Sequence, residues 1–235
     1  MIVERVVTTI AELTHELNVL PNHFAFRGQA DANWELQSTL ERVIGGRWSK
    51  ENARRFETYS LDVFKSKFHI YSGLEHIPKS KLSWLSVMQH YGVPTRLIDY
   101  TAIMDLSLQH IRKADTQFQE TRLTLQGKQD LVFDEVVDRY SYDIAWVTEP
   151  IELNARIDRQ SGTFLIAGNL EKRIESIVNL PLYESATLFK IRIPSSLYEG
   201  AYVALRKMNI NSKSIYGDLA GLAKSIKMEL QSYTT

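Results

Sequence analysis

The stretch SWLSVMQHYGVPTRLIDYT, residues 83–101, holds the signals for a helix end, a turn and a strand within one short segment. An apolar helical pattern over 81–91 stops at Gly92, a residue type that suits the left-handed conformation in which many helices end. Pro94 has no backbone N–H and prevents the helix from resuming. Residues 95–98 are then predicted to form a strand. The segment therefore predicts a helix–turn–strand unit.

The second half of this stretch carries more chemically capable side chains than a structural turn needs. They are Gln89, His90, Arg96, Asp99 and Thr101. Thr101 is suited to capping a further helix, whose N-terminus would favour a bound anion. Arg96 and Asp99 have two interpretations, because they can contact a ligand or form an ion pair that fixes the turn. His90 fits a helix-end histidine as well as a functional one.

A second polar motif closes a predicted strand near the N-terminus. In HFAFRGQ two phenylalanines alternate with other residues, which predicts a half-buried strand over 24–27. Arg27 lies at its end on the face opposite the aromatic side chains, and Gly28 lets another group approach the backbone closely. The planar guanidinium fork matches phosphate or carboxylate. We therefore predict an anionic ligand for Arg27, with an internal salt bridge to Asp99 or a glutamate as the alternative.

The remaining hydrophobic pattern predicts helices interleaved with early strands, then a run of strands, then helices. The further predicted helices cover residues 9–20, 50–68, 196–208 and 214–229. The further predicted strands cover residues 131–137, 144–148, 163–167 and 187–193. This strand spacing is too irregular for a doubly wound parallel sheet. We therefore predict an α+β fold with a mixed or antiparallel sheet flanked by helices, as a single domain over residues 1–235.

Composition excludes several classes of function. Basic and acidic residues number 28 each, so no overall charge draws the chain to nucleic acid or to an anionic membrane. Cysteine is absent, which excludes disulfides and cysteine-ligated metal. No two histidines are four residues apart, so no metal site is predicted. No apolar run reaches the about 18 residues of a spanning helix, and the N-terminus lacks a signal-peptide pattern. We expect a soluble, cytoplasmic protein with no membrane partner.

Five segments, in this order along the chain, carry a family resemblance. They are FRGQ at 26–29, WELQSTLER at 34–42, QHYGVPTRLIDYT at 89–101, NARIDRQSGTFL at 154–165 and YGDLAGLAKSI at 216–226. Together they resemble the FRG domain, a family named after the first motif, along nearly the whole chain. The QHYG-PTR-L-D segment is the most specific, although Tyr100 stands where the family usually has tryptophan.

A weaker resemblance connects the chain with mono-ADP-ribosyltransferases of the arginine–serine–glutamate type. In these enzymes an early strand ends in an aromatic residue followed by Arg-Gly, as at 26–28 here. A later strand ends in a Ser/Thr-rich turn that caps a helix, as at 98–101. A catalytic glutamate follows on a third strand, and Gln160 stands at about that place, with Glu149 and Glu152 as nearby acidic substitutes. The resemblance implies an ADP-ribosyltransferase-like fold and NAD as a substrate.

The same resemblance implies roles for the polar residues. Arg27 would hold the NAD pyrophosphate or ribose hydroxyls, and Thr101 with its helix N-terminus would hold the nicotinamide ribose. An acid near Gln160 would stabilise the oxocarbenium that forms as nicotinamide leaves, while His90 or Asp99 would deprotonate the acceptor. The remaining cofactor contacts would come from Gly28, Gln89, Tyr91 and Arg96.

Three interpretations remain open at this stage. The first is an enzyme that uses NAD to modify a nucleic-acid or protein acceptor, as a bacterial toxin or phage-defence factor, with an antitoxin or chaperone as a candidate partner. The second is a non-catalytic module that binds a phosphate-bearing nucleotide ligand or a protein partner through Arg27 and Arg96, which the lack of a clear catalytic glutamate favours. The third makes these polar residues a buried structural network.

Overall fold

The computed structural model describes residues 2–20, 24–72, 77–101, 129–139, 142–150, 159, 162–183 and 188–232. At its centre lies a three-stranded antiparallel sheet with the strand order β2-β4-β3. The bounds of these strands are Ile98–Thr101 for β2, Ala145–Thr148 for β3 and Gly162–Ala167 for β4. A separate two-stranded parallel sheet pairs β1 (Ile2–Val6) with β5 (Leu188–Arg192). Parallel and antiparallel pairing with flanking helices makes this an α+β fold, as predicted.

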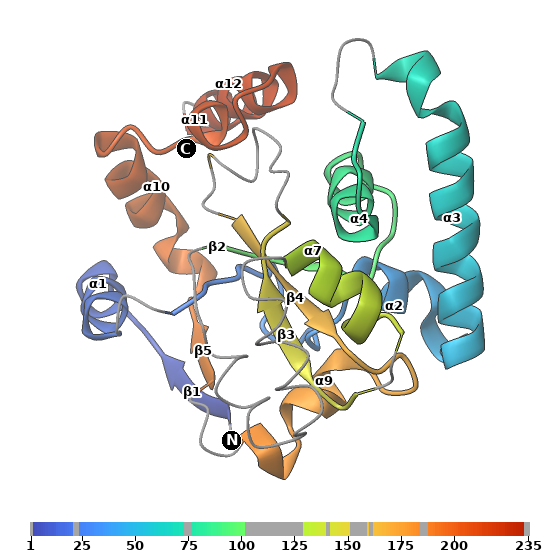
Figure 1. Cartoon of the computed structure of the whole chain (residues 1–235). Coiled ribbons are helices and arrows are strands. Elements are labelled where there is room, and N and C mark those ends of the chain that lie inside the picture. Colours follow the sequence, from blue (N-terminus) through green and yellow to red (C-terminus); the bar gives the residue numbers. More distant parts are fainter. Residues whose placement is uncertain are drawn as a thin grey trace.

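Helices surround these sheets (Figure 1). Within the described residues, the α-helices are α1 (Ile10–Val19), α2 (Thr39–Ile44), α3 (Lys50–Tyr71), α4 (Lys81–His90), α7 (Gln129–Val132), α9 (Ile174–Val178), α10 (Tyr198–Lys207), α11 (Ser212–Tyr216) and α12 (Leu219–Ser232). Turns of other helical types are η1 (Gly45–Arg47), the π-helical η2 (Phe133–Val137), η3 (Pro181–Tyr183) and η4 (Ser195–Leu197). Figure 1 shows α3 and α4 beside one another, with α10, α11 and α12 grouped on the other side of the molecule.

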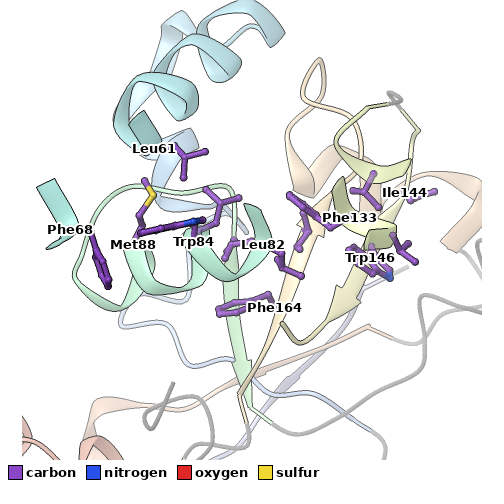
Figure 2. Packing of buried hydrophobic residues seen from close by; sticks show 14 residues of the cluster. Leu61, Phe68, Leu82, Trp84, Met88, Phe133, Ile144, Trp146 and Phe164 are labelled. Carbon is purple, nitrogen blue, oxygen red and sulfur yellow. The ribbon is translucent and has the colours of Figure 1, made fainter. Parts of the chain in front are cut away.

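β3 and β4 are largely buried on both faces, which explains their near-continuous apolar runs. Alternate side chains, among them Trp146, Phe164 and Ile166, belong to a cluster with residues of α3, α4 and η2. The intervening side chains, such as Ala145 and Leu165, belong to a second cluster with residues of α9. Figure 2 shows the first cluster, in which side chains of α3, α4, β3 and β4 meet. The sheet is thus the middle layer between two groups of helices.

Two glutamates, of which Glu41 is buried, join α2 and α9, which are far apart in the sequence. Ser38 caps α2, and Glu41 completes a capping box by accepting the Ser38 backbone N–H through Oε2 at 2.6 Å. Its Oε1 accepts the backbone N–H of Ile174, at the start of α9, at 2.9 Å. In return, Glu175 Oε2 accepts the backbone N–H of Leu36 at 2.6 Å. One buried glutamate therefore serves the N-termini of two helices.

Many of the predicted elements are present. The helices predicted at 9–20, 50–68, 81–91 and 196–208 correspond to α1, α3, α4 and α10, and the strands predicted at 144–148, 163–167 and 187–193 correspond to β3, β4 and β5. Gly92 ends α4 as predicted, with φ of 80° and its N–H donating to the Gln89 carbonyl at 3.0 Å. The strand predicted at 95–98 begins later, as β2, because the side chains of Thr95 and Arg96 are held by hydrogen bonds in the preceding turn.

Three predicted elements were wrong. Residues 131–137 form α7 and η2 rather than a strand, and the buried Phe133 and Val137 are four residues apart, which is a helical spacing. Residues 24–27 contain a single bridge residue, Phe26, and the Phe24 ring packs against Phe189 of β5. The helix predicted at 214–229 is divided into α11 and α12 by Gly217, which has φ of 67°.

Candidate functional site

Arg27 connects the FRGQ motif to strand β2. Its Nη1 donates to the backbone carbonyl of Asp99 at 2.9 Å. Its Nε is buried and has no hydrogen-bond partner among the described residues. No described carboxylate lies within ion-pair distance of Arg27, so the predicted alternative of a salt bridge to Asp99 is not formed. The guanidinium is therefore positioned by a neutral group and keeps a positive charge that an anion can neutralise.

Gln89, at the end of α4, holds the Asp99 side chain in place. Its Nε2 donates to Asp99 Oδ2 at 3.1 Å and to the Leu97 carbonyl at 3.2 Å. Its Oε1 accepts hydrogen bonds from the hydroxyl groups of Thr95 and Thr39. Thr39 in turn accepts the backbone N–H of Thr95 at 3.1 Å. Both ends of the Gln89 amide are thus engaged, which fixes the orientation in which it meets the exposed Asp99 carboxylate.

Asp99 and Tyr100 extend to opposite faces of β2, because successive side chains alternate along a strand. Asp99 is exposed, whereas Tyr100 packs against the cluster that contains Ile98 and Leu165. Burial raises the pKa of the Tyr100 hydroxyl, and the nearby charge of Arg27 partly opposes this rise. Arg27 therefore lies close to both residues, because its hydrogen bond goes to the carbonyl of the peptide group that joins them.

β2 and β3 finish at the same end of the sheet. Thr101 pairs with Gly162, and Thr148 pairs with Phe164, so both strands end beside the start of β4. Glu149 follows directly after Thr148, and burial raises the pKa of its carboxyl group. Glu149 is thus one described acid at this end of the sheet, and Asp99, which pairs with Phe164 as Thr148 does, is another. The Thr101 side chain, the helix predicted after it, Gln160 and Glu152 lie outside the described residues.

Arg96 is held in a buried ionic network away from Asp99. Its Nε donates to Glu57 Oε2 at 2.6 Å and its Nη2 to Asp138 Oδ1 at 2.7 Å. Lys81 bridges the same two acids, with Nζ 2.9 Å from Glu57 Oε1 and 2.7 Å from Asp138 Oδ2. Although burial alone would raise the pKa of both carboxyl groups, the cations hold both pKa values below the usual range. The Arg96 guanidinium, 4% exposed as a residue, is structural here.

Three further residues were predicted at the site. His90 and Tyr91 lie at the end of α4, and Gly28 follows Arg27. The His90 ring meets the Tyr91 ring edge-on, with centroids 4.7 Å apart. Tyr91 lies beside Phe64 of α3, so it points away from the Gln89 side, as helical residues two positions apart do. Gly28 is exposed, and a Cβ built on it would meet nothing within 4 Å. The structure thus brings Arg27, Gln89 and Asp99 together, with open space at Gly28, and directs Arg96 elsewhere.

Sequence reasoning missed the hydroxyl groups that support Gln89. Thr39 lies in α2, far from Gln89 in the sequence, and no motif connects them. Tyr100 was noted only as a departure from the family pattern, although it is the aromatic residue whose pKa responds to Arg27. Glu57 and Asp138 were also missed as partners of Arg96, because their separations in sequence leave no local signal.

Two kinds of feature are absent from the described residues. No group of three or more histidine, aspartate or glutamate side chains is arranged to hold a metal ion. No helix in the described part of the chain is both long and apolar enough to cross a membrane.

Comparison with known proteins identifies one family. Residues 22–115 match the family model of the FRG domain. This range contains FRGQ and QHYGVPTRLIDYT, whereas the segments at 154–165 and 216–226 lie outside it. Neither the curated proteins nor the solved structures contain a match to the chain. Residues 22–115 are therefore similar to the FRG domain, and Arg27, Gln89 and Asp99 of the two main motifs in this range meet in one site.

Proposed function

We propose that the chain is a cytoplasmic enzyme that binds NAD at Arg27 and transfers ADP-ribose to a nucleic-acid or protein acceptor. The observation that carries this proposal is the hydrogen bond from Arg27 to the Asp99 carbonyl, which joins the two motifs around a guanidinium that no described carboxylate neutralises. Such a cation suits the NAD pyrophosphate, which carries two negative charges and presents oxygens for a bidentate contact. A role as a toxin or defence factor would follow from modification of an essential acceptor.

The transfer breaks the bond between C1′ of the nicotinamide ribose and the nicotinamide nitrogen, and the bonding electrons leave with nicotinamide. The acceptor's oxygen or nitrogen then bonds to C1′, and its proton passes to a base. Asp99, oriented by Gln89, is the base in this scheme. Glu149, directly after β3, supplies the negative charge that stabilises the ribosyl cation in this scheme.

Variants of the full chain test this assignment. Arg27→Ala is expected to weaken NAD binding at least about tenfold in calorimetry, because it removes a charge-assisted contact. Asp99→Asn and Glu149→Gln are expected to retain binding but to lower nicotinamide release about a hundredfold. Arg55→Ala, which removes an exposed arginine of α3, is the matched control and should change neither quantity.

The assay measures nicotinamide release and transfer of label from NAD to DNA, RNA and protein supplied separately. Thermal melts of each variant check that the fold is intact. If the wild-type chain releases no nicotinamide with any acceptor, or if release persists in Arg27→Ala, the enzymatic proposal is wrong.

A non-catalytic module that binds a phosphate-bearing ligand through Arg27 is the second candidate. It is favoured by the position of Glu149, which follows β3, two strands away from β2 in the sheet. Two strand spacings separate these backbones by about 10 Å. In this case NAD or another nucleotide binds, Arg27→Ala abolishes the binding, and turnover is absent under all conditions.

A further inference from the structure

Trp34 is an exposed tryptophan in the loop that follows the FRGQ motif. It is 56% exposed, whereas Trp84 and Trp146 are buried and Trp48 is half-buried. Among the described residues, the Trp34 ring contacts neither another ring nor a cation. Tryptophan carries a large apolar surface, and leaving this surface in water has a free-energy cost that a stacked ligand would remove. The ring is therefore a candidate contact for a flat ligand.

Two side-chain hydrogen bonds hold the loop around Trp34 in place. Gln29 Nε2 donates to the Glu35 carbonyl at 3.2 Å, which joins the two ends of the loop. Arg192 Nη1, at the end of β5, donates to Asn33 Oδ1 at 3.3 Å. Trp34 thus lies between two anchored residues. An anchored ring loses little conformational freedom when a ligand binds, so little of the binding free energy is offset.

The same contacts keep the loop close to Arg27. Gln29 lies two residues after Arg27, so their Cα atoms are at most about 7 Å apart. The Gln29 side chain then reaches the residue next to Trp34. In addition, Leu36 and Tyr100 pack against one apolar cluster, and Tyr100 lies near enough to feel the charge of Arg27. Two separate connections therefore place the Trp34 loop beside a guanidinium whose buried Nε has no partner among the described residues.

The charges of this region differ between its two ends. Arg27 supplies a positive charge, whereas the exposed Asp31 and Glu35 lie on either side of Trp34 in the loop. Phosphate groups are attracted by Arg27 and repelled by the two carboxylates. A neutral base with an exocyclic amino group suits the Trp34 end, because its ring can stack while its N–H groups donate to a carboxylate oxygen. Adenine is a base of this kind.

We propose that Trp34 is the stacking platform for the adenine base of a nucleotide whose phosphates Arg27 holds. The assignment rests on the proposed function and deepens it, since it places the adenine end of NAD on the loop between Gln29 and Glu35. Gln29 is a positioning residue in this arrangement, because its hydrogen bond closes the loop that presents the ring.

The polarity of the loop favours a base over a protein partner at Trp34. Tryptophans that dominate protein interfaces lie within a larger apolar patch from which the partner excludes water. The residues around Trp34 in the loop, among them Asp31, Asn33 and Glu35, are instead polar and exposed. A single aromatic base needs only the face of one ring.

Calorimetry on the full chain with two probes tests the assignment. ADP-ribose carries the adenine and the pyrophosphate of NAD and is not consumed by the transfer, whereas inorganic pyrophosphate lacks the base. Trp34→Ala is expected to weaken ADP-ribose binding at least about tenfold and to leave pyrophosphate binding unchanged, because it removes only the stacking surface. Trp34→Phe keeps an aromatic face and should recover most of the affinity. Arg27→Ala should weaken the binding of both probes.

Tryptophan fluorescence gives a second readout, because Trp34 is the most exposed of the four tryptophans. ADP-ribose should quench the emission of the wild type, and Trp34→Phe should remove this quenching. Tyr59→Ala, which removes a 69% exposed aromatic residue of α3, is the matched control and should change neither binding nor quenching. Trp34 and Tyr59 are exposed, so the melting temperatures of these variants should match that of the wild type.

The possible results separate this assignment from the proposed function. Arg27-dependent binding of ADP-ribose that Trp34→Ala does not weaken would overturn the assignment and leave the nucleotide site intact. Equal losses of ADP-ribose and pyrophosphate binding in Trp34→Ala would also contradict stacking. Weaker binding of NAD with unchanged binding of ADP-ribose would move the contact to the nicotinamide ring. If neither probe binds the wild type, the proposed NAD site is itself wrong, and the adenine assignment is lost with it.

Discussion

Arg96 and Arg27 show how surroundings decide what an arginine does. Both were predicted to contact a ligand, and both lie in motifs of the FRG domain. Arg96 is surrounded by Glu57 and Asp138, so its charge is neutralised inside the protein. Among the described residues, Arg27 has a hydrogen bond to a carbonyl and no carboxylate partner, so its charge is available. The difference is invisible in the sequence, because it depends on residues brought together from three distant segments.

The Glu57–Arg96 pair predicts a large stability effect. Replacing Glu57, which is 1% exposed, by leucine leaves a buried guanidinium with a missing partner, and should cost about 3–5 kcal/mol in the free energy of unfolding. Combining Glu57→Leu with Arg96→Met removes both charges and should recover most of the loss. Urea unfolding measures both values.

Glu51→Leu, in the exposed first turn of the same helix, serves as the control and should change stability by less than about 0.5 kcal/mol. A Glu57→Leu variant as stable as the control would mean that the network contributes nothing to folding.

Elements with strong local signals were predictable, and elements that depend on distant contacts were not. α3 and α4 have serine caps and long apolar patterns, and β4 is a continuous apolar run. α2 has only six residues and is stabilised at its start by a capping box that also involves α9. β1 is a five-residue segment with two adjacent charged residues, Glu4 and Arg5, so its strand structure depends on pairing with β5. The sequence predicted that the two site motifs meet. It could not predict that Arg27 binds the backbone carbonyl of Asp99, because every residue has a carbonyl and none is marked in the sequence.

The turn after α4 provides a test of backbone conformation alone. A Cβ at Gly92 would meet no atom within 4 Å, but its φ of 80° is unfavourable for other residues. Gly92→Ala should therefore destabilise the protein by about 1 kcal/mol. Gly46 has the same open space without a positive φ, so Gly46→Ala should be neutral or slightly stabilising. Equal denaturation midpoints for the two variants would contradict this account.

The structural unit is larger than the family match. Residues 22–115 contain β2, but its neighbour in the sheet is β4. They contain Arg96, but Asp138 lies outside the match. The cluster around Phe164 and Trp146 also combines side chains from both parts. The matched segment supplies Arg27, Gln89, Asp99 and β2, and the later segment supplies β3 and β4, the other two strands of the sheet.

A fragment of residues 22–115 should therefore not fold on its own. It would expose one edge and one face of β2 and leave the ionic network incomplete. Circular dichroism melts should show a cooperative transition for the full chain and none for the fragment, and amide proton signals of the fragment should be poorly dispersed. A cooperative, well-dispersed fragment would show that the match is an independent domain.

The double role of Glu41 has an evolutionary consequence. Its two carboxylate oxygens serve the start of α2 and the start of α9 together. Aspartate, one methylene shorter, would be unable to reach both N–H groups, so even this conservative exchange loses one of them. Related chains are therefore expected to change residues 36–41 and 173–175 jointly during divergence, although the second segment lies outside the span by which the family is recognised.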